Sequence, residues 1–149
     1  MRALERVDRL APRLDGAAPS LCHGDLHPLN VLVDGERASV IDWTDAGMGD
    51  RPGDVARTAL LFRVAAVAAT SRAERGVLHA LAPLLARRYL RAYARHLPLD
   101  PARLRLWEPV HLLHGWAQLE AGDERSQDVS PVLGTWLRQR FEQRMAELG

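Results

Sequence analysis

The chain contains no lysine, so its 20 basic residues are all arginines. It also carries 19 acidic residues, and the formal net charge is only +1. A chain with balanced, interspersed charges has no strong field to attract nucleic acid or an anionic membrane surface. We therefore expect neither of these partners.

Cysteine and long apolar runs are also scarce. The single cysteine, Cys22, excludes an internal disulfide. Residues 1–20 are charged and amphipathic, and they lack the apolar core of a signal peptide. The most apolar stretch, residues 58–70, is interrupted by Arg63 and is too short to span a bilayer. These features predict a cytoplasmic protein without a membrane segment.

The composition is otherwise that of an ordinary globular protein. Of the 149 residues, 47% are apolar and 26% are charged, which is far from the composition of disordered chains. This length is enough for one sizeable core and does not require a second domain. We expect residues 1–149 to fold as a single domain.

Most of the chain has the apolar spacing of helices. Leucine and valine recur at helical intervals in residues 2–14, which predicts a surface helix there. Asp100 and Ser130 each precede a proline, as helix N-caps often do. Further helices are predicted over residues 53–69, 72–96, 101–120 and 132–148.

Residues 30–42 have a different pattern. Two short β-rich runs, residues 30–33 and 38–42, flank the sequence Asp-Gly-Glu-Arg. An Asp-Gly pair between such runs is a strong hairpin signal. Together with the long helices, this hairpin predicts an α+β fold that is predominantly helical.

The segment before the hairpin carries a catalytic pattern. Residues 21–30 read Leu-Cys-His-Gly-Asp-Leu-His-Pro-Leu-Asn, which places His23, Asp25 and Asn30 at the spacing of a kinase catalytic loop. A carboxylate beside a substrate hydroxyl can orient it and accept its proton during phosphoryl transfer. An amide oxygen five residues later can ligate Mg²⁺ without adding charge.

The hairpin should bring a second metal ligand to this loop. Its strands carry the chain out from Asn30 and back to Asp42, so the two side chains are expected at the same open end. An amide oxygen and a carboxylate form a plausible cradle for Mg²⁺ that bridges nucleotide phosphates. The sequence therefore predicts Asn30 and Asp42 as metal and nucleotide ligands.

Two further carboxylates precede the first long apolar helix. Asp50 and Asp54 lie in the run Gly-Met-Gly-Asp-Arg-Pro-Gly-Asp-Val-Ala, where an acidic residue in the first turn complements the helix dipole. Either one can also accept hydrogen bonds from the backbone of the loop around His23 and Asp25. We expect both to support the site structurally.

These three stretches together resemble the aminoglycoside phosphotransferase family, which is similar to the protein kinases and includes choline and homoserine kinases. The matching motifs cover residues 21–56. The resemblance implies that Asp25 is the catalytic base, that His23 shapes the loop, and that Asn30 and Asp42 hold Mg²⁺ with ATP as co-substrate. It also implies that residues 1–149 are a helical C-terminal lobe whose N-terminal lobe is absent.

Three differences from the family pattern stand out. Leu29 occupies a place where the family often has a small residue, and Trp43 follows Asp42 in place of the Phe-Gly of protein kinases. The third difference is larger, because kinases of this fold hold the nucleotide phosphates with a strand lysine. A chain without lysine cannot make that contact, so we expect weak or undetectable ATP binding by residues 1–149 alone.

Other polar residues have a functional and a structural interpretation. His27 can contact the substrate or pack within the loop, and packing is the simpler interpretation. In the resembling family the C-terminal helices line the acceptor cleft, so acidic residues there are candidates for contact with a cationic or sugar-like substrate. These candidates are Glu120, Asp123 and Glu124.

Two other combinations are better explained by packing. His111 and His114 are three residues apart on a predicted helix, but two histidines without a third ligand are a weak metal signal. Cys22 and His23 are adjacent on a strand-like segment, where neighbouring side chains point in opposite directions. They therefore make a poor nucleophile and base pair, and Cys22 is expected to be a small buried residue.

Two hypotheses follow from the sequence. The first is the C-terminal lobe of an ATP-dependent phosphotransferase that acts on a small hydroxylated molecule and needs a separate N-terminal lobe. The second is a non-catalytic kinase lobe that serves as a binding or interaction module. In either case the face that an N-terminal lobe would cover is expected to be apolar and prone to self-association.

Overall fold

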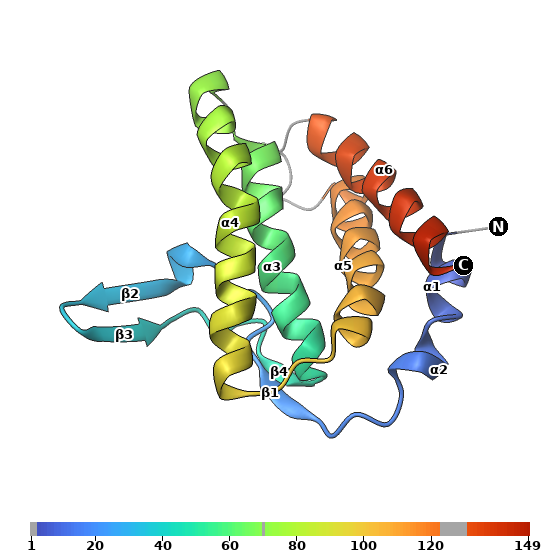
Figure 1. Ribbon diagram of the computed structural model, residues 1–149. Coiled ribbons are helices and arrows are strands. Elements are labelled where there is room, and N and C mark those ends of the chain that lie inside the picture. Colours follow the sequence, from blue (N-terminus) through green and yellow to red (C-terminus); the bar gives the residue numbers. More distant parts are fainter. Residues whose placement is uncertain (1–2, 70, 123–130) are drawn as a thin grey trace.

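The computed structural model describes residues 3–69, 71–122 and 131–149, and it shows long helices beside two short strand pairs (Figure 1). The predominantly helical α+β fold is thus confirmed. In chain order the elements are α1 Ala3–Asp8, α2 Ala11–Leu14, β1 Ser20–Cys22, the 3₁₀ turn η1 Pro28–Asn30, β2 Val31–Asp34, β3 Arg37–Val40, β4 Gly47–Gly49, α3 Arg51–Ala68, α4 Arg72–His96, α5 Pro101–Ala121 and α6 Pro131–Leu148.

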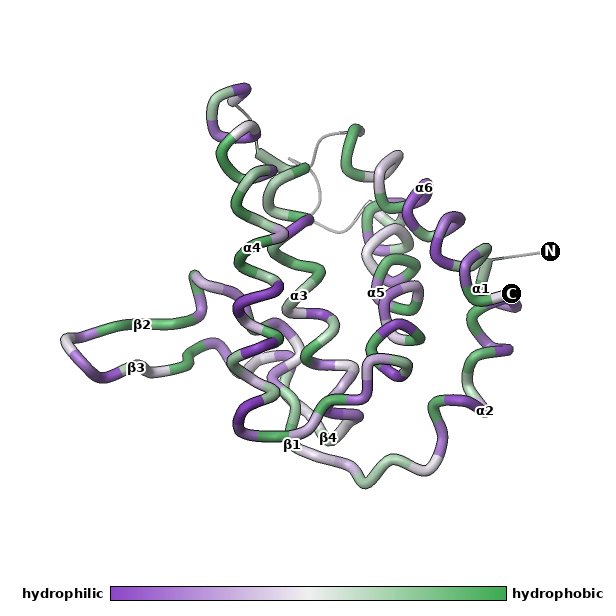
Figure 2. Tube along the Cα trace, viewed as in Figure 1, coloured by the Kyte–Doolittle hydropathy of each residue, from purple (hydrophilic) through white to green (hydrophobic). Residues whose placement is uncertain are grey.

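The centre of the helical part is α3, which packs against α4, α5 and α6. Its buried residues lie on several sides of the helix, as expected for an element with neighbours around it. Figure 2 shows apolar residues along the helices that face one another. The main core cluster joins α3, α5 and α6 through Leu60, Val67, Leu112, Leu133, Leu137 and Phe141.

The long helices begin and end within two residues of their predicted bounds. The Ser71 hydroxyl caps α4 by accepting a hydrogen bond from Glu74 N at 3.1 Å. The Asp100 carboxylate caps α5 through Ala102 N at 2.8 Å, as predicted. Gly122 follows α5 at a φ of +68°, in the left-handed conformation that often ends helices. The predicted cap Ser130 lies outside the described residues.

The single helix predicted over residues 2–14 is wrong. The structure has two short helices there, α1 and α2, separated at Arg9 and Leu10. Pro12 explains the break, because it has no N–H to donate and its ring collides with the carbonyl four residues earlier in a continuous helix.

The hairpin predicted from residue 30 to residue 42 is present as β2 and β3. Val31 pairs with Val40 and Asp34 with Arg37, and Gly35 takes the positive φ that the turn requires. Figure 1 shows the hairpin extending away from the helices. Its apolar side chains are largely uncovered, and Val33 is 72% exposed.

A second strand pair was missed by the sequence analysis. Ser20 pairs with Gly49 and Cys22 with Gly47, which joins β1 to β4. The segment from Thr44 to Gly53 therefore contains a strand and the start of α3. Glycine is a weak strand former, so the composition of β4 gave no signal.

No helix within residues 3–69, 71–122 and 131–149 is both long enough and apolar enough to cross a bilayer.

Candidate active site

The loop from His23 to Asn30 lies between β1 and β2. Pairing of β1 with β4 places Cys22, directly before this loop, opposite Gly47. Because β4 leads within two residues into α3, the first turn of that helix lies beside the loop. Segments some 30 residues apart in the chain therefore form one site.

Asp54 anchors the backbone of this loop from the first turn of α3. Its two carboxylate oxygens accept hydrogen bonds from His23 N at 3.1 Å and from Gly24 N at 2.8 Å. Hydrogen bonds to a charged acceptor are stronger than neutral ones. The backward contact that the sequence suggested for Asp50 or Asp54 is made by Asp54.

Asp50 has a different set of partners. Its Oδ2 accepts hydrogen bonds from Arg103 Nε at 2.7 Å and from Trp107 Nε1 at 2.5 Å, both on α5. Arg103 also donates to the Leu14 carbonyl. Asp50 therefore joins α5 to the start of α3 and makes no hydrogen bond to the His23–Asn30 loop in the described part of the chain.

His23 is buried, and both of its ring nitrogens have partners. Nε2 lies 3.0 Å from the Ile41 carbonyl oxygen, and Nδ1 accepts a hydrogen bond from Asp25 N at 3.3 Å. The carbonyl can only accept, so the proton is assigned to Nε2. His23 thus connects the backbone at Asp25 to the end of the hairpin, and only 4% of its surface is exposed.

The Asp25 carboxylate faces two cationic or potentially cationic groups. Arg57 Nη2 lies 3.2 Å from Oδ1, and His27 Nε2 lies 3.5 Å from Oδ2. The Asp25 side chain is 32% exposed, so a substrate can approach it. His27 was expected to pack within the loop, and the structure places its ring beside this carboxylate.

Arg57 was not identified from the sequence. It follows Asp54 by three residues on α3, a spacing that puts both side chains on one face of a helix. That spacing was the available signal, but it indicates a contact only once the loop is known to lie against this face. One face of α3 therefore holds both the loop backbone and the Asp25 carboxylate.

Asn30 and Asp42 occupy the open end of the hairpin. Ile41 N donates to the Asn30 carbonyl at 3.0 Å, which extends the ladder one step beyond the Val31–Val40 pair. The Asn30 side chain is buried, and its Nδ2 donates to the Asp25 carbonyl at 3.0 Å. With Nδ2 directed at the Asp25 carbonyl, the amide oxygen of Asn30 points away from that carbonyl.

Asp42 has an uncommon backbone conformation. In the described ranges it is the one residue other than glycine with a positive φ, at +59°. The Thr44 hydroxyl donates to its Oδ1 at 2.6 Å. Such conformations cost energy and cluster at functional sites.

The donor atoms at this end of the hairpin suit Mg²⁺. Asn30 and Asp42 supply one neutral and one anionic oxygen, and Mg²⁺ prefers oxygen ligands while keeping water or phosphate in its other positions. An ion held by these two side chains would keep other positions for water or phosphate oxygens.

A family model described as "Phosphotransferase enzyme family" matches residues 1–107. The chain belongs to this family. The match confirms the resemblance found in the sequence, and it includes the loop from His23 to Asn30, the hairpin and the whole of α3 and α4. Comparisons with curated proteins and with solved structures found no match.

The remaining substrate candidates are Glu120, Asp123 and Glu124. Glu120 is exposed near the end of α5 and accepts a hydrogen bond from Trp116 of the same helix at 2.7 Å. Asp123 and Glu124 lie outside the described residues. Of the two predicted substrate residues that the structure describes, His27 lies beside the Asp25 carboxylate and Glu120 contacts Trp116.

His111 and Cys22 are packing residues. His111 Nε2 lies 2.8 Å from the Gly53 carbonyl oxygen, its ring stacks on Trp107, and burial lowers its pKa to about 4. Cys22 is buried, and burial together with the nearby Asp54 and Asp50 raises the pKa of its thiol. A raised pKa disfavours the nucleophilic thiolate.

Proposed function

We propose that residues 1–149 form the single-domain C-terminal catalytic lobe of an ATP-dependent kinase that phosphorylates a hydroxyl group of a small molecule. The observation that carries the proposal is the convergence of Asp25, Asn30 and Asp42 at one end of a hairpin. Their spacing, and the anchoring of the loop backbone at His23 and Gly24 by Asp54, suit phosphoryl transfer, in which positioning and charge stabilisation supply most of the catalysis.

In this proposal Asp25 orients the acceptor hydroxyl. The hydroxyl oxygen bonds to the γ-phosphorus as the bond from phosphorus to the β,γ-bridging oxygen breaks, ADP leaves, and the hydroxyl proton passes to the Asp25 carboxylate. Asn30 and Asp42 are the residues that would hold Mg²⁺, which supplies charge neutralisation at the phosphates. Arg57 and His23 keep the carboxylate and the loop in place.

The nucleotide clamp must come from outside this chain. No lysine is available to contact the phosphates. The exposed apolar residues Leu29, Leu32 and Val33 beside the proposed site suit burial under a second lobe, from upstream sequence or from a separate chain. Without that lobe we expect self-association through this face and little affinity for nucleotide.

The test of catalysis uses a protein that combines this chain with its nucleotide-binding lobe. Phosphoryl transfer from labelled ATP is measured against a panel of aminoglycosides, choline, homoserine, macrolides and sugars. Asp25→Asn should lower turnover of the accepted compound by about two to four orders of magnitude. The matched control Asp34→Asn, an exposed turn carboxylate, should retain it. Turnover by Asp25→Asn at the level of the control would refute the proposal.

The chain alone provides a second test. Calorimetry of residues 1–149 with Mg²⁺ and ATP should show little or no heat of binding. Micromolar affinity would show that the lobe holds nucleotide without a clamp, and it would contradict the need for a second lobe.

The alternative function, a non-catalytic binding module, is favoured by the absence of lysine. It requires that the combined protein bind a panel compound and fail to phosphorylate it.

A further inference from the structure

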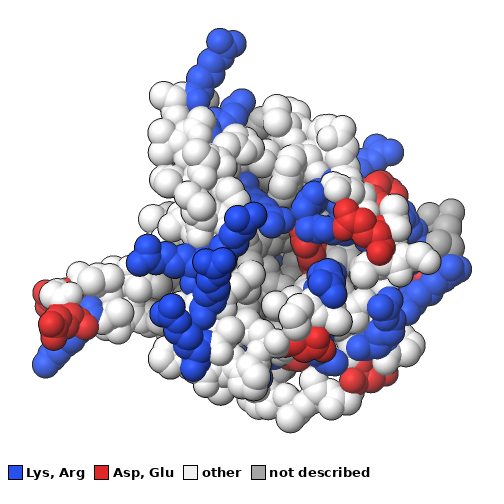
Figure 3. Space-filling view, viewed as in Figure 1, with Lys and Arg blue, Asp and Glu red and all other residues white. Residues whose placement is uncertain are grey.

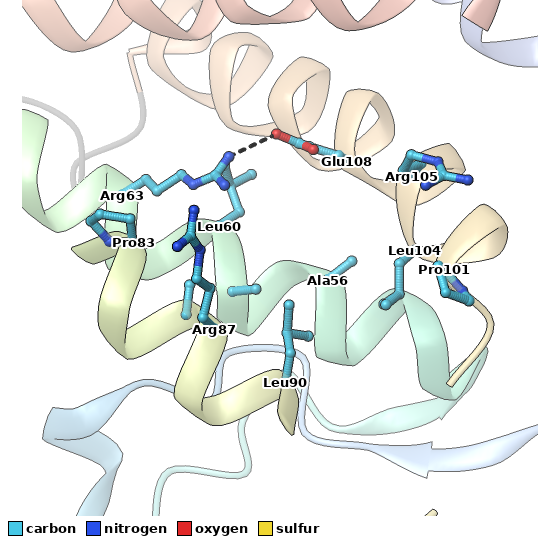
Figure 4. A pocket seen from close by; sticks show the side chains of 12 residues that line it. Ala56, Leu60, Arg63, Pro83, Arg87, Leu90, Pro101, Leu104, Arg105 and Glu108 are labelled. Carbon is cyan, nitrogen blue, oxygen red and sulfur yellow. Dashed lines mark hydrogen bonds and ion pairs between the residues drawn. The ribbon is translucent and has the colours of Figure 1, made fainter. Parts of the chain in front are cut away.

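A cleft of about 300 Å³ opens between α3, α4 and α5 (Figure 4). No residue of the catalytic loop lines it. Its lining from α3 is Ala56, Ala59, Leu60 and Arg63, and neither Asp54 nor Arg57 of the same helix is part of it. The cleft is therefore separate from the proposed active site.

The polar residues of the cleft are mostly cations. Arg63, Arg87 and Arg105 line it, and Glu108 is the single carboxylate in its lining. Figure 3 shows arginine side chains gathered around the hollow on this face of the molecule. In Figure 4, Arg87 extends from α4 toward Arg63 on α3. Two guanidinium groups thus face the same part of the cleft.

The Glu108 carboxylate does not neutralise Arg87 and Arg105, because it already pairs with Arg63 and Arg144. Arg63 Nη1 lies 3.2 Å from its Oε1 and Arg144 Nε lies 2.9 Å from its Oε2. Arg140 Nε is 3.6 Å from the same carboxylate. Arg87 and Arg105 form no ion pair or hydrogen bond with the residues that the structure describes. The cluster therefore has a surplus of positive charge.

Arg140 does not line the cleft, but it lies 3.6 Å from the Glu108 carboxylate, which does. The pKa of Arg140 lies below its ordinary value, first because of burial and next because of repulsion by Arg144, while Glu108 acts in the opposite direction. An anion bound nearby would relieve the repulsion among these guanidinium groups. The electrostatics of the cleft thus favour an anionic ligand.

The floor of the cleft limits which anion fits. Small and aliphatic side chains from all three helices form it, namely Ala56, Ala59, Leu60, Ala86, Leu90 and Leu104. A fully hydrated inorganic ion would gain nothing from this surface, whereas a ligand with an apolar body would bury area against it. Guanidinium groups at the rim match the planar geometry of carboxylate and the oxygens of phosphate.

We propose that this cleft binds a small organic anion. The apolar body of the ligand lies on the floor formed by Leu60, Leu90 and Leu104, and its carboxylate or phosphate group contacts Arg63 and Arg87. Because none of the proposed catalytic residues lines the cleft, this binding site does not depend on the kinase proposal.

The test titrates the 149-residue chain by calorimetry with three probes. 2-Naphthoate combines an apolar body with a carboxylate, 2-naphthamide has the same shape without charge, and acetate has the charge without the body. Loss of either feature should weaken binding by about tenfold or more. Equal binding of 2-naphthoate and 2-naphthamide would overturn the proposal, and so would the absence of saturable 2-naphthoate binding at about 10 mM, the range of very weak ligands.

Two variants locate the binding. Arg87→Gln removes an exposed cation that lines the cleft, and Arg88→Gln removes its exposed neighbour on the same helix, which does not line it. Arg87→Gln should weaken 2-naphthoate binding by about tenfold, the value of one charge-assisted hydrogen bond, while Arg88→Gln leaves it unchanged. An equal loss in both variants would show diffuse attraction to α4, and no loss in Arg87→Gln would show binding elsewhere. Either result overturns the proposal.

Discussion

Arg57 on α3 lies 3.2 Å from the carboxylate of Asp25 in the loop from His23 to Asn30. The Arg57 side chain is 21% exposed and that of Asp25 is 32% exposed, so the pair is partly screened by solvent. One turn earlier, Asp54 holds the backbone of the same loop. A single helix face therefore controls both the position of the loop and the direction of its carboxylate.

We predict that Arg57→Met lowers kcat in the protein that combines both lobes, by about one to two orders of magnitude, because the carboxylate loses the group that orients it. Arg57→Lys should restore part of the loss. The KM for ATP should change little, because Arg57 contacts the Asp25 carboxylate, whereas Asn30 and Asp42 are the proposed metal ligands. A half-exposed ion pair contributes at most about 1 kcal/mol, so urea unfolding should shift only slightly. Unchanged kcat in Arg57→Met would contradict the positioning role.

Asp54 should matter more for folding than Arg57 does. Asp54→Ala leaves the N–H groups of His23 and Gly24 without their acceptor in a partly buried loop. We expect a loss of about 1–3 kcal/mol in the free energy of unfolding, measured by urea denaturation. Asp34→Ala removes an exposed turn carboxylate and serves as the control, with a change within about 0.5 kcal/mol. Equal effects of the two substitutions would refute the anchoring role.

Local signals explain which parts of the fold could be predicted. The hairpin has an Asp-Gly turn between β-rich runs, and the cap at Asp100 is followed directly by Pro101, so the information lies within a few residues. The loop motif from His23 to Asn30 is also contiguous. These elements appear in the structure close to their expected bounds.

Contacts between distant segments could not be predicted in the same way. The β1–β4 pair joins segments some 30 residues apart, and the glycines of β4 carry no strand propensity. Arg57 can contact Asp25 because the β1–β4 pairing and the Asp54 hydrogen bonds place α3 against the loop. Asp50 seemed suited to the loop by sequence, yet two donors on α5 engage it. Each depends on tertiary packing that no local pattern records.

Gly53 is a further position whose residue type is set by tertiary packing, and a substitution there can test this. A Cβ added there would lie 2.9 Å from the indole ring of Trp107, closer than real contacts allow. In an exposed helix interior, Gly→Ala stabilises by up to about 1 kcal/mol. At Gly53 we expect the opposite sign, a loss of about 1–3 kcal/mol, because the ring is also held by Asp50 and cannot easily move.

Gly76 on α4 is the matched control, since a Cβ there would meet open space. Thermal unfolding of the two variants should shift in opposite directions, with Gly76→Ala more stable than the wild type. Stabilisation by Gly53→Ala would show that α5 moves away from α3 at little cost. It would also weaken the view that Asp50 and Trp107 fix these two helices together.

His111 gives the stability a pH dependence whose sign can be derived. Burial lowers its pKa from the ordinary value of 6.5 to about 4. Between these values the unfolded chain binds a proton that the folded chain excludes, so stability falls as pH decreases from about 6.5 to about 4. The full difference corresponds to at most about 3 kcal/mol.

His111→Gln keeps an N–H donor for the Gly53 carbonyl but does not titrate. Urea unfolding across this range should therefore show the wild type losing stability relative to the variant as pH falls. A difference between the two proteins that stays constant with pH would show that His111 does not exclude the proton.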